Sequence, residues 1–292
     1  MTSSRAGWLF VTPALLAIGV FFALPVLAAL LLSATDFDIY ALADLRNVRF
    51  VGLDNYLRLL QTPLFWQALR NTLFFVVIGV PTSLALSLGS ALLLNAGVAR
   101  AKGVFRTALF APVVTTLVAV AVIWIYLLHT RYGLINYGLG LLGLPRVDWL
   151  GDPSWSMPAI AIFSIWKNYG YNMVIFLAAL QSIPGDLYEA ARIDGASGPQ
   201  QLRYVTLPSL APTLLLVSVL TIAGYFQLFA EPYVMTQGGP LQSTTSVLYF
   251  MYEEGFKWWN LGSASAVAFV LFFLTLIITR VQLAVARRWG SP

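Results

Sequence analysis

The sequence has no cysteine, one histidine, and only 10% charged residues in a chain of 292. The missing cysteines exclude disulfide bonds, thiolate metal sites and a cysteine nucleophile. A single histidine also argues against a histidine-based metal or acid–base site. A soluble domain carries about 25% charged residues. The charge deficit, together with 59% hydrophobic residues, therefore indicates a polytopic membrane protein.

Enzyme motifs are also missing, and no polar segment is long enough to hold a soluble catalytic domain. The chain lacks the G-x-x-x-x-G-K-[ST] loop that cradles nucleotide phosphates, and it has no G-x-S-x-G or H-E-x-x-H pattern. We therefore expect a chain that is not an enzyme and that holds no metal, ATP or other cofactor. The net charge of +5 is spread along the chain, so it indicates membrane topology rather than nucleic-acid binding.

Six apolar runs are long enough to cross a bilayer, whose core needs about 20 helical residues. They cover residues 8–33, 73–99, 107–128, 156–183, 209–230 and 261–279. The first run is too long for the apolar region of a cleaved signal peptide, so we expect a retained span. The sequence thus predicts an all-α membrane protein with six transmembrane helices.

Six spans place both termini on the same side of the membrane. Lysine and arginine are almost equally numerous on the two sides, so their count alone does not decide the orientation. Arg100, Lys102 and Arg106, on the side of the termini, lie in a short loop close to span ends. This concentration of positive charge next to the span ends predicts that both termini are cytoplasmic.

Residues 186–208, DLYEAARIDGASGPQQLRYVTLP, form a polar loop between two long apolar runs. Asp186 suits a helix N-terminus, and Gly195 supplies the left-handed turn that ends a first short helix. Pro199 opens a second helix, which we expect to end at Thr206–Pro208. Helices this short are marginal in water, so they must dock on another surface. A solvated connecting loop is the alternative interpretation.

Two segments between spans carry further patterns. Residues 50–60, FVGLDNYLRLL, place Leu53, Tyr56, Leu57 and Leu60 at helical spacing and predict a short interfacial helix. Residues 231–240, EPYVMTQGGP, contain a Gly-Gly-Pro turn. The small residues 262–266 at the start of the last span predict close helix packing.

Polar side chains inside spans are costly and often mark a transport pathway. They form two clusters, one in the fourth span (Ser164, Trp166, Lys167, Asn168, Tyr169, Tyr171, Asn172) and one in the fifth (Thr221, Tyr225, Gln227, Glu231). Aromatic faces, amides and hydroxyls suit sugar rings better than ions or lipids. Two other interpretations are open. The aromatic residues and a snorkelling Lys167 belong to the interfacial belt, or the amides form interhelical hydrogen bonds.

The polar loop resembles the EAA motif of binding-protein-dependent ABC importer permeases. Glu189-Ala190-Ala191, Asp194-Gly195-Ala196 and Leu207-Pro208 fall at the spacing of that family, whereas Gly198-Pro199 and Leu202 depart from its large and aromatic residues. FVGLDNY, the F-W-x-A-L-x-N-T of residues 65–72 and the T-x-G-G-P of residues 236–240 are similar to the sugar-type branch. This branch includes the six-span inner-membrane subunits of maltose, lactose and glycerol-phosphate importers.

The resemblance implies a permease domain at residues 71–283, preceded by an N-terminal span and first periplasmic segment (1–70) and followed by a cytoplasmic tail (284–292). It implies that the polar loop is a coupling helix in a cleft of an ATPase subunit. The residues at that contact would be Leu187, Glu189, Ala190, Ala191, Asp194, Gly195, Ala196 and Pro208. In relatives, sugar contacts come from the spans on either side of the EAA loop. The matching positions and the polar clusters point to Ser164, Trp166, Asn168, Tyr171, Thr221, Gly224, Tyr225, Gln227 and Leu228.

The resemblance also implies a set of partners in the bacterial inner membrane. These are a second permease subunit, two ATPase subunits that hold ATP and magnesium, a periplasmic or lipoprotein substrate-binding protein, and membrane lipid, with no nucleic acid. An alternative is the same fold for a solute such as glycerol-phosphate, but only Lys167 supplies a cation within the spans. Another alternative is a secondary transporter that uses Lys167 and Glu231 as an ion relay.

Overall fold

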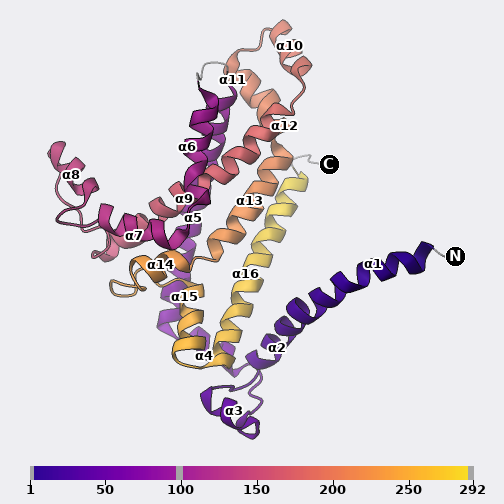
Figure 1. Ribbon diagram of the computed structural model, residues 1–292, viewed down its shortest axis with the longest axis vertical. Helices are drawn as coiled ribbons and strands as arrows, with labels where there is room; N and C mark the ends of the chain where they lie inside the picture. The colour runs from indigo at the N-terminus through magenta and orange to yellow at the C-terminus, as the bar shows by residue number, and fades with distance from the viewer. Residues whose placement is uncertain (1–2, 97–100, 289–292) are drawn as a thin grey trace. The chain divides into compact units, whose positions relative to one another are not determined.

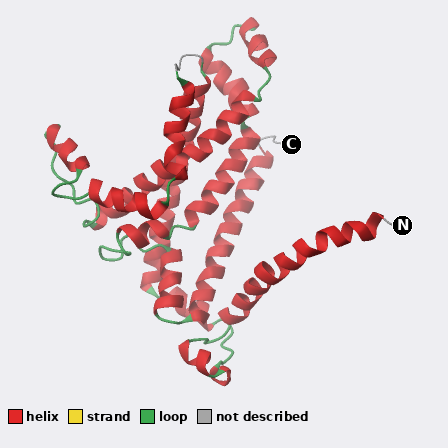
Figure 2. Ribbon diagram, viewed as in Figure 1, coloured by secondary structure: helices red, strands yellow, loops and turns green. Residues whose placement is uncertain are grey.

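The computed structural model describes residues 3–96 and 101–288, and the regular elements there are helices (Figures 1 and 2). An isolated bridge between Thr35 and Phe50 is the one β pairing in these ranges. The predicted all-α fold is therefore confirmed. Contacts divide the chain into two compact units, Met1–Trp66 with Phe250–Phe273, and Gln67–Tyr249 with Leu274–Pro292. Each unit is described by itself.

The first unit begins with a long apolar helix, α1 (Ser3–Ile18), which continues through the π-helical turn η1 (Gly19–Ala23) into α2 (Leu24–Ser33). The segment between the first two spans contains α3 (Ile39–Ala43), η2 (Leu45–Asn47) and α4 (Asp54–Gln61). The chain returns to this unit through α15 (Val247–Tyr252), η4 (Glu253–Lys257) and the start of α16 (Leu261–Arg288).

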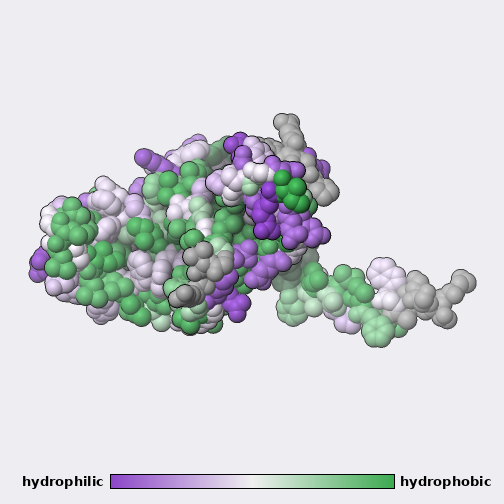
Figure 3. Space-filling view, turned by 90° about the horizontal axis from the view of Figure 1, so that it is seen from above, coloured by the Kyte–Doolittle hydropathy of each residue, from purple (hydrophilic) through white to green (hydrophobic). Residues whose placement is uncertain are grey.

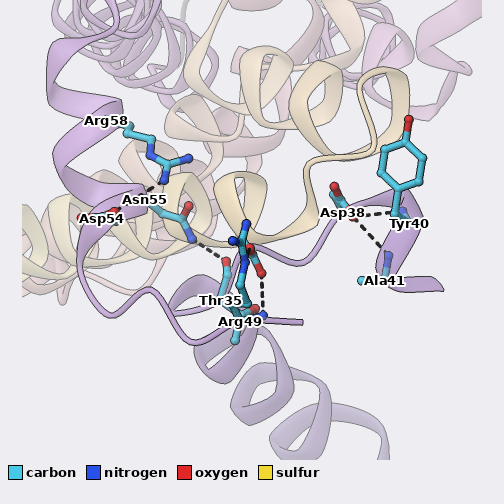
Figure 4. Close-up of polar contacts among 9 residues, drawn as sticks. Thr35, Asp38, Tyr40, Ala41, Arg49, Asp54, Asn55 and Arg58 are labelled. Atoms are coloured by element: carbon cyan, nitrogen blue, oxygen red, sulfur yellow. Dashed lines mark hydrogen bonds and ion pairs between the residues drawn. The ribbon is translucent and has the colours of Figure 1, made fainter. Parts of the chain in front are cut away.

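Carboxylates organise the segment between the first two spans (Figure 4). Asp36 accepts hydrogen bonds from the backbone N–H of Arg49 at 2.7 Å and from its guanidinium at 2.8 Å. The backbone N–H of Arg49 is the main reason why the pKa of Asp36 lies below its ordinary value. Asp38 caps α3 by accepting from the N–H groups of Tyr40 and Ala41. These bonds satisfy backbone donors that a short helix leaves open.

A short helix is confirmed within the predicted segment 50–60, but α4 begins only at Asp54, because Phe50 pairs with Thr35 and Gly52 has a φ of +60°. It buries Asn55, whose amide donates to the carbonyls of Ser33 and Thr35 at 2.9 and 2.7 Å. Leu57 stays exposed, as expected of a side chain that faces lipid at the membrane interface. A Cβ on Gly262, at the start of α16, would collide with the Thr35 carbonyl. The close packing predicted for the start of the last span is therefore present.

The second unit is built on four long segments. These are α5 (Pro63–Asn95), the pair α6 (Lys102–Val114) and α7 (Leu117–Leu127), α9 (Pro153–Gln181), and α13 (Ala211–Phe226) with α14 (Ala230–Met235). The short helix α8 (Leu134–Leu141) follows α7. A fully buried core lies where α5, α9 and α13 meet, and it contains Ala91, Met173, Phe176, Leu210 and Val217.

Within the described residues, four helical segments are long and apolar enough to cross a membrane: Gly7–Ser33, Pro63–Asn95, Ala211–Met235 and Leu261–Arg287. The bent pair α6–α7 adds a fifth if it is counted as one span. The fourth predicted span corresponds to α9, which is 29 residues long but carries the polar cluster. Helices long and apolar enough to span a membrane are thus present at most of the predicted positions, and the count of six stays a prediction.

The third predicted span is not one continuous helix. α6 and α7 meet at an angle of 101°, across Thr115 and Thr116. Both threonines have extended backbone, with ψ angles of 152° and 133°. Pro112 has no N–H for the helical ladder, and β-branched threonines favour extended conformations. The predicted third span over residues 107–128 is therefore divided between two helices.

The polar loop folds as α10 (Gly185–Ile193), α11 (Gly198–Gln201), the π-turn η3 (Leu202–Thr206) and α12 (Leu207–Ser209). Gly195 ends the first helix with a φ of +79°, as predicted. Asp186 lies in the first turn of α10, as expected of an acid that suits a helix N-terminus, and Pro184 holds the N-cap position. Ser197 and Gln200 form a capping box, an S-x-x-Q signal visible in the sequence.

The predicted end of the second short helix at Thr206–Pro208 is wrong. The chain stays helical through Ser209, because the wider turn η3 leads directly into α12. Pro208 falls in the first turn of α12, where its missing N–H costs nothing. The Gly-Gly-Pro turn is confirmed farther along the chain, with Gly238 at a φ of +81°.

Candidate functional site

A cavity of about 300 Å³ lies within the second unit, between α9 and α13. Residues of α5 and α6 complete its walls. Its lining combines amides, hydroxyls, aromatic rings and one carboxyl group: Phe75, Val113, Ser164, Asn168, Tyr171, Asn172, Leu220, Thr221, Gly224, Tyr225, Gln227, Leu228 and Glu231. The cavity thus offers hydrogen-bond donors and acceptors together with flat apolar surfaces.

The predicted substrate-binding residues converge on this cavity, with one exception. Those in its lining are Ser164, Asn168, Tyr171, Thr221, Gly224, Tyr225, Gln227 and Leu228. Trp166 lies outside the lining, and its ring packs against that of Trp124 with centroids 5.3 Å apart. The reason is helical spacing. Ser164, Asn168 and Tyr171 share one face of α9, whereas a residue two positions from Ser164 faces elsewhere.

Five lining residues fall outside the predicted set: Phe75, Val113, Asn172, Leu220 and Glu231. Asn172 and Glu231 belong to the two polar clusters, so the sequence carried a signal for them. Leu220 precedes the predicted Thr221 on the same helix. Phe75 and Val113 come from α5 and α6, and no local pattern indicates that these segments approach α13.

A buried hydrogen bond joins the two helices that flank the polar loop. The side-chain amide of Asn172 donates to the hydroxyl oxygen of Thr221 at 2.9 Å, and that hydroxyl donates to the carbonyl of Val217 at 2.7 Å. The interhelical interpretation of Asn172 is therefore confirmed. The bond fixes the spacing of α9 and α13 across the cavity.

The two charged residues of the polar clusters have separate partners. The Ser164 hydroxyl donates to a carboxyl oxygen of Glu231 at 3.2 Å, in the wall of the cavity. Lys167 is 5% exposed, and its ammonium donates to the carbonyl of Val113 at 3.2 Å. The snorkelling interpretation of Lys167 is therefore wrong. Within the described part of the chain, the ion pairs do not include one between Lys167 and Glu231.

Packing fixes the aromatic wall of the cavity. The ring of Tyr225 stacks on Phe75, with centroids 4.9 Å apart and planes at 27°. It also lies directly against Gly79, where an added Cβ would collide with ring atoms. The hydroxyls of Tyr225 and Ser83 are both buried beside this wall. The stacking on Phe75 and the close fit against Gly79 thus hold the tyrosine ring in place.

The polar loop presents an exposed surface at one end of the second unit, where α10 and α11 lie (Figure 1). No residue of α10 is buried, and Ile193 at its end is 86% exposed. The Tyr188 and Thr206 hydroxyls are 2.9 Å apart and tie α10 to η3. A view onto this end shows hydrophilic residues gathered over the loop (Figure 3). A helix that buries nothing within its own chain gains stability by docking on a partner.

The predicted coupling residues lie on or beside this surface. Leu187, Glu189, Ala190, Asp194, Gly195 and Pro208 are exposed, and Ala191 and Ala196 are partly exposed. Glu189 forms an exposed ion pair with Arg192 at 3.9 Å. Exposed pairs of this kind contribute little to stability, so Glu189 is available to a partner at small cost.

Comparison with known proteins gives a consistent result over nearly the whole chain. The family model described as "Binding-protein-dependent transport system inner membrane component" matches residues 95–291. The lactose transport system permease protein of Rhizobium radiobacter is 36% identical over 287 residues, which cover 96% of this chain and 94% of the relative. The trehalose/maltose transport system permease protein of Thermococcus litoralis is 36% identical, with 97% and 94% covered.

A relative with a charged solute and a solved structure extend this comparison. The sn-glycerol-3-phosphate transport system permease protein of Pectobacterium atrosepticum is 34% identical, with 99% of this chain and 98% of the relative covered. The crystal structure of a bacterial ABC transporter that imports the acidic polysaccharide alginate contains a chain of the same fold. That chain has a TM-score of 0.80 at 24% identity, with 98% of both chains covered.

Proposed function

Because the chain belongs to the family of binding-protein-dependent transport system inner membrane components, we propose that it is the permease subunit of an ATP-driven importer for a sugar or oligosaccharide. Relatives of known name that align along almost their full lengths carry lactose and trehalose or maltose. Their likeness to this chain supports a sugar substrate but does not name it.

The composition of the cavity between α9 and α13 is the observation that supports a neutral sugar. Its polar lining consists of amides, hydroxyls and the carboxyl group of Glu231, and none of the lining residues is a lysine, arginine or histidine. Lys167 is not in the lining, and its ammonium donates to the backbone carbonyl of Val113. A phosphate ester or an acidic polysaccharide needs cationic donors. A neutral sugar needs amides and hydroxyls for its ring hydroxyls and an aromatic face for its C–H surface.

The mechanism that fits this site is alternating access driven by partner subunits. This chain forms half of the pathway, and a second permease subunit forms the other half. Two ATPase subunits hold ATP and magnesium at the cytoplasmic face, where both termini lie, and a substrate-binding protein delivers the sugar from outside. α10 docks on an ATPase subunit and transmits its closure to α9 and α13, which the Asn172–Thr221 bond joins across the cavity.

A co-purification experiment tests the coupling surface. Tagged chain is purified in mild detergent with its partners, as wild type and as Glu189→Arg and Asp194→Arg. We expect the wild type to retain an ATPase subunit and both variants to lose it, because a reversed charge at a docking surface repels its partner. Arg203→Glu, a charge reversal on η3 outside the predicted contact set, is the control. Retention of the ATPase by both variants would contradict the coupling role of α10.

Sugar transport tests the cavity. The assembled transporter is reconstituted in proteoliposomes with its binding protein, and ATP-dependent uptake of a panel of labelled neutral sugars is measured. We expect Asn168→Ala and Gln227→Ala to raise the half-saturating sugar concentration by about 2- to 12-fold each, since one hydrogen bond contributes roughly 0.5–1.5 kcal/mol. Trp166→Phe, outside the lining, should match wild type. Equal effects of all three substitutions would show that the sugar does not bind in this cavity.

A further inference from the structure

A second cavity in the same unit, of about 200 Å³, lies where α5 ends and α6 begins, against the C-terminal end of α9. Its walls have two chemically different parts. The floor is apolar and contains Leu94 and Leu177, which are 5% and 8% exposed. The rim is polar and contains Asn95, Lys102, Arg106 and Gln181.

The rim carries positive charge without a compensating acid. Lys102 and Arg106 are four residues apart on α6, so they share one face of that helix. None of the residues that line the cavity is acidic. In the described ranges, neither cation belongs to an ion pair. The Lys102 ammonium donates to the Asn95 carbonyl at 3.4 Å, a long bond that leaves other ammonium protons free.

The position of the cavity restricts the nature of its occupant. The ends of α5 and α6 that form it lie at the same end of the second unit as the polar loop (Figure 1). The proposed function places this end at the cytoplasmic face, where the leaflet carries anionic lipids. The cationic rim suits the phosphate of a lipid headgroup in that leaflet. Leu94 and Leu177 are themselves buried in the core, so they add only a small apolar contact for the carbons next to the phosphate.

We propose that this cavity binds the phosphate group of an anionic phospholipid from the cytoplasmic leaflet. The Arg106 guanidinium and the Lys102 ammonium donate to the phosphate oxygens, and the side-chain amides of Asn95 and Gln181 provide neutral donors beside them. Basic pockets between transmembrane helices on this side of a membrane have the chemistry that such headgroups require. The site differs from the cavity between α9 and α13, with which it shares no lining residue.

The bound lipid would link the α5–α6 connection to the helix that leads into the coupling loop. Gln181 is the last residue of α9, and α10 begins at Gly185. An occupant that contacts both Gln181 and Arg106 therefore holds the base of the polar loop against α6. The lipid composition of the membrane would in this way influence how firmly α10 is positioned for its ATPase.

A lipid titration of the purified full chain tests the proposal. The protein is stripped of lipid in detergent, and its unfolding midpoint is followed as phosphatidylglycerol, phosphatidylcholine or inorganic phosphate is added. We expect phosphatidylglycerol to raise the midpoint of wild type with saturation, and phosphatidylcholine to leave it nearly unchanged. Replacing both cations, in Lys102→Gln/Arg106→Gln, should raise the half-saturating phosphatidylglycerol concentration about 25-fold, roughly five-fold for each basic residue.

Two variants serve as controls. Arg280→Gln removes an exposed cation of α16 that is not in the lining and should respond like wild type. Lys102→Arg/Arg106→Lys keeps both charges and should retain phosphatidylglycerol binding, which separates loss of the site from loss of the fold. Equal responses to the two lipids, or a wild-type response of the double glutamine variant, would overturn the proposal.

The titration with inorganic phosphate identifies the source of the phosphate group. If inorganic phosphate at the same concentration reproduces the midpoint shift, the lipid assignment is wrong and the ligand is a soluble phosphate. The titration uses neither sugar nor ATPase, so its failure would not affect the transport function. Conversely, a failure of sugar uptake would leave the lipid result intact.

Discussion

Gly170 marks the point where α6 and α9 approach with their backbones. A Cβ added to Gly170 would collide with the carbonyl oxygen of Leu109, and it would lie 3.1 Å from the Leu109 carbonyl carbon and 3.2 Å from the Cα of Phe110. All three atoms belong to the backbone of α6, so no side-chain rotation relieves the contact. Gly170→Ala therefore forces the two helices apart.

The size of the effect follows from two opposing contributions. Inserting a methyl group into a packed site that cannot yield costs about 1–3 kcal/mol. Alanine in place of glycine in a helix interior stabilises the folded state by roughly 0.5–1 kcal/mol. We therefore expect a net loss of about 0–2.5 kcal/mol, centred near 1.3 kcal/mol or roughly 10-fold in the folding equilibrium. Gly170→Leu should cost more, because a larger group meets the same backbone.

Reversible unfolding in mixed detergent and SDS micelles, followed by tryptophan fluorescence, measures this difference. Gly89→Ala is the matched control, since Gly89 lies inside helix α5 and its added Cβ would meet no heavy atom within 4 Å. We expect the control to be neutral or stabilised by up to about 1 kcal/mol. If Gly170→Ala were as stable as Gly89→Ala, the backbone contact between α6 and α9 would be refuted.

Two further predictions concern polar contacts. A double-mutant cycle with Asn172→Leu and Thr221→Val should give a coupling free energy of about 0.6 kcal/mol, and at most about 1.7 kcal/mol, in the same unfolding assay, since these are the average and the maximum for hydrogen bonds between transmembrane helices. Additive single effects would show that the bond is not formed. The backbone N–H of Arg49, followed by its side chain, holds the pKa of Asp36 below its ordinary value of 3.8. The stabilisation from Asp36 should therefore be complete above about pH 5 and be lost as the pH falls through 3.8 toward the lower folded-state pKa. The free energy of unfolding of wild type should fall between about pH 5 and pH 3, and that of Asp36→Asn should fall less over the same range. An equal fall in both proteins would contradict this assignment.

Local signals in the sequence predicted much of the fold and most of the cavity lining. Gly195 ends α10 because a left-handed turn needs glycine, and this requirement is visible in the residue itself. The polar residues of α9 and α13 could be grouped because both helices adjoin the same loop and their polar positions recur with helical spacing. Phe75 and Val113 could not be predicted, because their place in the lining depends on how α5 and α6 pack against other helices.

Lys167 shows why tertiary contacts decide the role of a charged residue inside a span. The sequence placed a long basic side chain near aromatic residues, a pattern typical of snorkelling to the membrane interface. The structure instead breaks the preceding span after Val114, which interrupts the helical hydrogen bonding around Val113. An unsatisfied carbonyl within a membrane costs several kcal/mol, and the buried Lys167 ammonium supplies the missing donor. Because Val113 lines the cavity and α7, beyond the break, packs on α14, Lys167 supports the wall of the cavity rather than contacting the membrane surface.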